Sequence, residues 1–231
     1  MTLAGGVLKR LALQPPAFAV DWQRFAAALS PRTRLVIVNT PHNPSATAWQ
    51  AEDMQQLWHA IAEREIYVLS DEVYEHICFA KGGHASVLAH PQLRQRAIAV
   101  SSFGKTFHMT GWKVGYCVAP AALSAEVRKV HQYLTFSVNT PAQLALAIAC
   151  APSRSTGDSC RRSIAPSEIA LCRALASSRL EILPCAGTLL LAGGLQRHLR
   201  SGRCSVLPLV NRARGRGGHS AVGLLCRSFP P

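Results

Sequence analysis

The 231-residue sequence has no apolar run long enough to cross a membrane, since its longest, near residues 144–151, is far shorter than a span. The N-terminal segment MTLAGGVLKRLALQPP also lacks the charged segment, apolar segment and cleavage site of a secretory leader. Because 48% of the residues are hydrophobic, the chain can form a globular core. We therefore expect a cytoplasmic protein with no membrane partner.

The eight cysteines lack the spacing of a metal site. No two of them form a Cys-x-x-Cys pair, and neither His198 nor His219 stands at a metal-ligand spacing from a cysteine. We expect free thiols and no bound metal. The histidines of the first part have no acid or cysteine at a suggestive spacing, so packing or surface roles are expected for His42, His76, His84, His108 and His131.

Acidic and aromatic residues are scarce in the last third of the sequence. Residues 151–231 hold 12 arginines, no lysine, three acids and a single aromatic residue, Phe229, so most of the net charge of +13 belongs to this segment. Out-of-frame reading of a GC-rich gene would give such a composition. We expect a boundary near residue 150 and a degenerate, poorly ordered region beyond it, and a genuine divergent tail is the alternative.

Short apolar runs alternate with amphipathic segments through the first 150 residues. Helices are predicted from Asp21 to Leu29, with Asp21 as the cap, and from Ser124 to Phe136, with Ser124 as the cap. This alternation predicts βαβ units, a mostly parallel sheet with flanking helices, and the α/β class. The other predicted segments are strands at 7–13, 34–39, 66–70, 97–101 and 114–119, and helices at 52–64 and 141–150.

Three polar residues follow three of the predicted strands. Asn43, Asp71 and Lys105 come after the strands at 34–39, 66–70 and 97–101. Open α/β sheets bind ligands beyond the carboxyl ends of their strands, so these side chains are expected to converge. A lysine against an apolar wall can act as a neutral amine nucleophile. An amine, a carboxylate and an amide in this arrangement indicate a Schiff-base site for pyridoxal 5′-phosphate (PLP).

Three segments in this order resemble the cofactor motifs of the class I and II aminotransferases, which are PLP enzymes of fold type I. They are NTPHNPSATAW (39–49), LSDEVYEH (69–76) and SSFGKTFHMTGWKVGY (101–116), and the last is similar to the methionine and kynurenine–glutamine transaminase branch. The resemblance implies that residues 1–150 are part of the large, PLP-binding domain, entered after its start. Beyond residue 150 it returns only at 175–188, a remnant of the small domain.

The resemblance also implies roles for individual residues. Lys105 would hold PLP covalently and carry a proton between Cα and the cofactor. Asp71 would pair with the protonated ring nitrogen, and Asn43 and Tyr74 would hydrogen-bond the phenolic oxygen. Ordinary alternatives are a helix cap for Asp71, a turn residue for Asn43 and a core aromatic for Tyr74.

The phosphate would be bound by Ser102 and Lys113, where many family members have arginine in place of Lys113. Lysine binds phosphate as a point charge, without the guanidinium fork. The alternatives are a strand-end hydroxyl for Ser102 and a solvated cation for Lys113.

The function that the resemblance implies is PLP-dependent transamination between an amino acid and a 2-oxo acid in a homodimer. Methionine, aromatic or glutamine-like amino acids are the implied substrates. No arginine of the tail matches the motif that grips the substrate carboxylate, so we expect impaired turnover. A PLP-dependent β-lyase and a non-catalytic remnant remain alternatives. RNA binding through Arg212, Arg214 and Arg216 is a distant one, because no aromatic residue interleaves with them.

Overall fold

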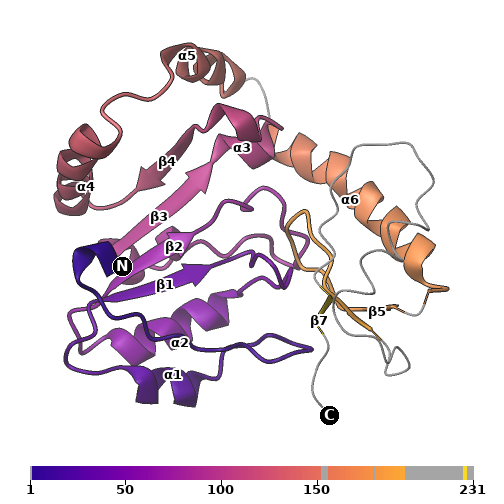
Figure 1. Cartoon of the computed structure of the whole chain (residues 1–231), viewed down its shortest axis with the longest axis horizontal. Coiled ribbons are helices and arrows are strands. Elements are labelled where there is room, and N and C mark those ends of the chain that lie inside the picture. The colour runs from indigo at the N-terminus through magenta and orange to yellow at the C-terminus, as the bar shows by residue number, and fades with distance from the viewer. Residues whose placement is uncertain (1, 152–155, 179, 196–225, 228–231) are drawn as a thin grey trace.

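The body of the molecule is a four-stranded sheet in the order β1–β2–β3–β4 (Figure 1). The structure is a computed structural model that describes residues 2–151, 156–178, 180–195 and 226–227. The first three strands are parallel and β4 is antiparallel to β3, which confirms the α/β class with a mostly parallel sheet. The strands are β1 (Leu35–Asn39), β2 (Tyr67–Asp71), β3 (Ala97–Ser102) and β4 (Gly115–Val118).

Two helices, α1 (Trp22–Ala28) and α2 (Ala51–Ile61), cover one face of this sheet (Figure 1). Asp21 caps α1 as expected, because its side chain accepts a hydrogen bond of 2.9 Å from the Arg24 N–H. Alternate strand residues point toward the helices and exclude water, which is the main source of stability in such a layer. The buried core that results comprises Val36, Val38, Met54, Leu57, Ile61, Ile66, Val68, Val87, Leu93, Ala97 and Ala99.

Two expectations about local structure are wrong. Residues 7–13 form no strand, and Lys9 Nζ instead donates to the Ala28 carbonyl at 3.0 Å. A strand needs a neighbour for its backbone groups, and within the described residues this run has none. Helix α4 (Ala121–Leu134) begins after Pro120 and is not capped by Ser124, whose hydroxyl donates to the Ala119 carbonyl.

The other face of the sheet and the β4 edge remain apolar and exposed. Ile37 of β1 and Tyr67 of β2 are 50% and 46% exposed. Helix α4 buries none of its residues, and α5 (Thr140–Ala149), which Asn139 caps, buries only two. Parallel sheets usually have both faces covered, so this surface is of the kind that proteins bury against further polypeptide.

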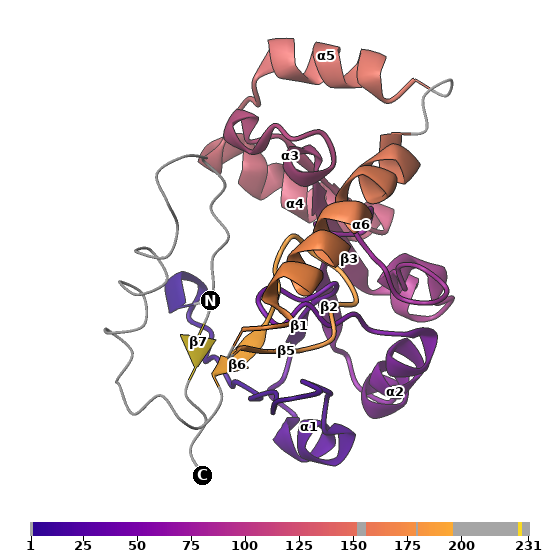
Figure 2. The same cartoon turned by 90° about the vertical axis from the view of Figure 1, so that its right-hand side faces the viewer.

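The C-terminal elements lie beside the carboxyl ends of β1, β2 and β3 in both views (Figures 1 and 2). They are α6 (Thr156–Leu175) and a second sheet of β5 (Leu180–Ile182), β6 (Gly193–Leu195) and β7 (Cys226–Arg227). Regular structure therefore occurs in the described part of residues 151–231. The domain boundary at residue 150 stays a prediction.

The segment 183–188 is bonded to loops of the first part. Ala186 donates its N–H to the Ala46 carbonyl and accepts from Phe79, both at 2.8 Å, and the Thr188 N–H donates to the Ile77 carbonyl at 2.8 Å. At Gly187 a Cβ would lie 2.7 Å from the side chain of Pro41, so the close approach requires glycine. Part of the 175–188 segment is thus built into the edge where the strands end.

Short helices complete the described structure. The short helices are η1 (Thr2–Ala4), η2 (Val87–Ala89), η3 (Leu93–Gln95), α3 (Phe103–Thr106) and η4 (Thr110–Trp112). Two of them bear on the candidate site, because α3 carries Lys105 and η4 ends next to Lys113. Among the described helices, none combines the length and the apolar composition that a membrane crossing requires.

Arg212, Arg214 and Arg216, the arginines of the RNA-binding alternative, lie outside the described residues.

Candidate active site

The parallel strands end in polar residues at one edge of the sheet. Asn39 and Asp71 end β1 and β2 and are partners in the ladder, and the Asn39 side-chain amide donates to the Asp71 carbonyl at 3.0 Å. The Asn39 side-chain oxygen accepts from the Asn43 N–H at 2.8 Å. This chain of bonds fixes the loop that carries Asn43 to the strand end that carries Asp71.

Tyr74 is the centre of the site. It is 4% exposed, and Lys105 Nζ lies 5.7 Å from the centroid of its ring. Burial raises the pKa of Tyr74, the negative charge of Asp71 raises it further, and a hydrogen bond with the Asn43 side chain opposes them without reversing the shift. The phenol therefore keeps its proton at neutral pH and can donate it in a hydrogen bond. The structure thus brings together four of the six predicted site residues.

Ser102 is the cap of the short helix that carries Lys105. Its hydroxyl oxygen accepts from the Gly104 N–H at 3.1 Å, and the same hydroxyl donates to the Val114 carbonyl at 3.3 Å. A Cβ on Gly104 would lie 3.0 Å from the Thr110 Cα, so this tight turn favours glycine. Ser102 is the last residue of β3 and the N-cap of α3. From this position its hydroxyl can cap the helix and could also contact the cofactor phosphate.

Lys113 lies between η4 and β4 with an exposed side chain. Its backbone is in the left-handed region, with φ 57°. The next carbonyl along the chain, that of Val114, accepts from both the Ser102 hydroxyl and the Phe103 N–H. Lys113 is therefore held next to the start of α3, although its side chain does not hydrogen-bond to Ser102.

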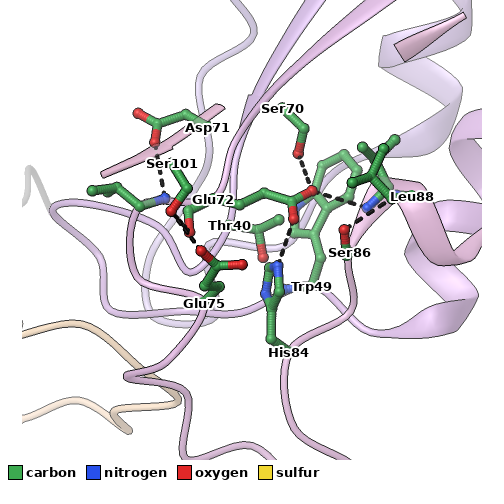
Figure 3. A network of polar contacts seen from close by, with 12 residues as sticks. Thr40, Trp49, Ser70, Asp71, Glu72, Glu75, His84, Ser86, Leu88 and Ser101 are labelled. Carbon is green, nitrogen blue, oxygen red and sulfur yellow. Dashed lines mark hydrogen bonds and ion pairs between the residues drawn. The ribbon is translucent and has the colours of Figure 1, made fainter. Parts of the chain in front are cut away.

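A buried carboxylate–imidazole hydrogen bond lies behind the site (Figure 3). The Glu72 Oε2 lies 2.8 Å from the His84 Nε2, and Glu72 is 2% exposed. The Glu72 Oε1 accepts from the Ser70 hydroxyl at 2.8 Å and from the Val87 N–H at 2.9 Å. The pair anchors the loop that follows β2 to the end of that strand.

His84 was expected to have only a packing or surface role, because no acid stands at a suggestive spacing from it, and the structure adds a hydrogen bond to Glu72. This partner lies 12 residues upstream, and only the loop after β2 brings the two together. The sequence carried one signal for Glu72: it follows Asp71 at the end of a strand, where neighbouring side chains point to opposite sides. Glu72 therefore faces the interior when Asp71 faces the site.

The Glu72 carboxylate makes the fold sensitive to acid. Burial alone would raise its pKa, but hydrogen bonds from His84, Ser86 and the Val87 amide outweigh burial, and the pKa is lowered from 4.5. A depressed pKa stabilises the fold above pH 4.5, and this contribution is lost as the pH falls through the folded-state value. We expect urea denaturation below pH 4.5 to show a steeper loss of stability in the wild type than in Glu72→Gln. Equal slopes would contradict this assignment.

Comparison with known proteins identifies the family. The family model described as aminotransferase class I and II matches residues 1–210. The chain belongs to the class I and II aminotransferases. The match extends past residue 150, and the family is PLP-dependent. The resemblance of the three cofactor motifs is therefore confirmed at the level of the family.

Two curated relatives agree with the branch that the motifs predicted. Methionine aminotransferase of Escherichia coli strain K12 is 68% identical over 192 residues, which are 81% of this chain and 49% of the relative. Kynurenine–oxoglutarate transaminase of Dictyostelium discoideum is 39% identical over 132 residues, which are 56% of this chain and 30% of the relative. The chain spans half or less of the length of these relatives.

A solved structure shows the same fold. The crystal structure of YbdL from Escherichia coli, for which a methionine aminotransferase function was identified, matches with a TM-score of 0.88 and 61% identity. The match covers 91% of this chain and 55% of YbdL. The arrangement of the strand ends described above therefore belongs to an aminotransferase large domain, present in part.

Proposed function

We propose that this chain binds PLP through Lys105 and supports transfer of an amino group between an amino acid and a 2-oxo acid. The observation that carries the proposal is the convergence at Tyr74. The Lys105 amine lies over its ring, the Asn43 amide bonds to its phenol, and the Asp71 carboxylate acts on its pKa. An amine, a phenol, an amide and an acid are thus gathered beyond the carboxyl ends of parallel strands, where α/β sheets bind ligands.

The donor set fits the chemistry of PLP. The ring of PLP has a basic nitrogen, a phenolic oxygen, an aldehyde and a phosphate, and each has a matching group here. Asp71 accepts one backbone bond, from the Val73 N–H at 3.2 Å, and a carboxylate oxygen can accept more than one hydrogen bond. When bound, PLP acts as a sink for the electrons left by cleavage of the Cα–H bond.

Each of these residues would have a defined role in that reaction. The Lys105 amine would hold the cofactor and, once free, move the proton that leaves Cα. The Asp71 carboxylate would keep a proton on the ring nitrogen by pairing with its positive charge. Tyr74, whose phenol stays protonated at neutral pH, would donate to the phenolic oxygen together with the Asn43 amide.

Ser102 and Lys113 would hold the phosphate at the start of α3. We expect Lys113→Ala to weaken PLP affinity by about 10- to 100-fold, the usual loss for a hydrogen bond to a charged group. Lys113→Arg should retain or improve binding, because the guanidinium fork matches phosphate oxygens. Equilibrium titration of PLP absorbance measures both. Unchanged affinity in Lys113→Ala would assign the phosphate to other groups.

The substrate side of the proposal rests on the relatives. Two of them are a methionine aminotransferase and a kynurenine transaminase, so we propose methionine, aromatic or glutamine-like amino acids as donors. A homodimer, which the family resemblance implies, is also proposed. The exposed apolar side chains of α4, such as Tyr133 at 86% and Leu134 at 80%, offer surface for further polypeptide.

The decisive experiment mixes the purified chain with PLP, reduces with borohydride and locates the modified residue by peptide mass spectrometry. We expect the label on Lys105. Turnover of methionine with a 2-oxo acid is then compared with that of the full-length Escherichia coli relative. We expect a lower rate here, because no arginine of the tail matches the motif that grips the substrate carboxylate.

The same experiment separates the alternatives. Ammonia and a 2-oxo acid formed without a new amino acid would indicate a β-lyase. Labelling without turnover would indicate a remnant that keeps its cofactor site. Absence of the label on Lys105 would refute the proposed site. Salt-dependent RNA binding that is lost on deleting residues 197–231 would support the RNA-binding alternative.

A further inference from the structure

One carboxylate joins two of the three motif segments, 69–76 and 101–116, behind the proposed site. Glu75 follows Tyr74 directly, and its Oε1 accepts from the Ser101 hydroxyl of β3 at 2.6 Å and from the Tyr116 hydroxyl of β4. Ser101 and Tyr116 are partners across the β3–β4 ladder. Figure 3 shows the Glu75 carboxylate directed at Ser101. We call these three residues the Glu75 cluster.

Two members of the Glu75 cluster adjoin residues proposed to contact PLP. Glu75 is bonded to Tyr74 along the chain, and Ser101 is bonded to Ser102, the cap of the helix that carries Lys105. The backbone supports the same link, because the Glu72 N–H donates to the Val100 carbonyl of β3 at 2.8 Å. The cluster therefore fixes the segment that holds Tyr74 against the segment that holds Lys105.

The Tyr116 ring extends this link to α3. Its centroid lies 5.1 Å from that of Phe103, the first residue of α3. Burial, the hydrogen bond to Glu75 and the negative charges of Glu75 and Glu72 together raise the pKa of Tyr116 to about 12. The hydroxyl thus stays a donor to Glu75 at any pH at which the enzyme would work.

Other charges near the carboxylate have little effect. The His76 Nε2 lies 3.9 Å from the same Oε1, but the two side chains are 45% and 23% exposed, so water screens this ion pair. The two hydroxyls are therefore the principal partners of Glu75.

We propose that Glu75 and Tyr116 are positioning residues that hold Tyr74 and Lys105 in register for PLP. They touch neither cofactor nor substrate, and they act through Tyr74 and the helix that carries Lys105. The inference rests on the proposed function, because it assigns a cause to the placement of Lys105 Nζ over the Tyr74 ring.

The first test measures PLP binding by the full chain and three variants. Glu75→Ala should weaken PLP affinity about tenfold, the loss expected for removing a charged acceptor. It should also shift the pH at which the absorbance of the Lys105-bound cofactor changes, because Tyr74 no longer sits correctly beside the phenolic oxygen. Glu75→Gln should restore most of both properties, since its amide oxygen still accepts from two hydroxyls. Tyr116→Phe should give a smaller loss than Glu75→Ala.

A second readout needs no cofactor. Ultraviolet titration follows the ionisation of the four tyrosines, and the Tyr116→Phe variant identifies the step that belongs to Tyr116. In the wild type this step should lie near pH 12, and in Glu75→Ala it should fall below that value but stay above 10, because burial, the largest cause of the shift, remains. A step that stays near pH 12 would show that Glu75 does not bond Tyr116, and would overturn the inference.

The control variant, Glu126→Gln, changes a carboxylate on α4 that pairs with Lys129 at the surface, and it should alter neither readout. If the wild type binds PLP and Glu75→Ala binds it with equal affinity and pH dependence, the inference is wrong and the proposed function stands. If the wild type binds no PLP, the proposed function fails and the inference fails with it. If Glu75→Ala does not fold, Tyr116→Phe decides, and unchanged affinity in that variant overturns the inference.

Discussion

Replacing Lys105 with alanine should abolish the borohydride-fixed attachment of PLP to this chain. The amine of Lys105 is the one placed over the Tyr74 ring, and alanine offers no group that can form a covalent bond with an aldehyde. We expect no labelled peptide from residues 97–116 and no measurable amino-group transfer. Lys105→Arg should behave in the same way, because a guanidinium stays protonated and is not a nucleophile.

The matched control is Lys129→Ala. Lys129 lies on α4, is 70% exposed and pairs with Glu126 at 2.7 Å, so its loss should leave both the labelling of Lys105 and the affinity unchanged. Residual noncovalent binding of PLP by Lys105→Ala would be consistent with the remaining groups at Asp71, Tyr74 and Asn43. Transfer of the label to another lysine, at the wild-type yield, would refute the assignment of Lys105.

Replacing Glu72 with alanine should cost about 3–5 kcal/mol of stability, because each buried donor left without its acceptor costs about 1–3 kcal/mol. The substitution leaves the Ser70 hydroxyl and the Val87 N–H without their acceptor, and it leaves the His84 imidazole without its buried partner. The His84 Nδ1 already has no partner among the described atoms, so a second unsatisfied nitrogen would remain in the interior. Urea denaturation followed by circular dichroism measures the change.

Two comparisons make this result specific. Glu126→Ala removes an exposed carboxylate from a surface pair and should change stability by less than about 1 kcal/mol. Glu72→Gln keeps the size of the side chain and one acceptor oxygen, so it should lie between the wild type and Glu72→Ala. A loss below about 1 kcal/mol in Glu72→Ala would show that the pair does not anchor the loop after β2.

Much of the secondary structure of the first 150 residues could be predicted from the local pattern of apolar and polar residues. The strands β1, β2 and β3 were expected within one residue of their bounds, because buried strands of a parallel sheet are continuous apolar runs between helical segments. The residues after them were also expected to converge, because parallel strands place their carboxyl ends at one edge. The run at 7–13 had the same local pattern but formed no strand, since a strand also needs a neighbour.

The contacts behind the site could not be predicted in this way. The His84–Glu72 pair and the Glu75 cluster join residues that are 12 to 41 positions apart, and no spacing rule relates them. The partners of the segment at 183–188, which are the carbonyl of Ala46 and the backbone around Ile77, are even farther away along the chain. Such pairs form only when loops fold back on the sheet.

The sequence by itself determined the family, the order of strands and helices, and the residue types proposed to bind PLP, because each of these is a pattern of neighbours along the chain. Only the tertiary structure decided which side chains hold those residues in place. Burial excludes water, so the Glu72 carboxylate must be hydrogen-bonded by protein groups. Which groups these are depends on how the loop after β2 folds, and no local sequence pattern predicts that geometry.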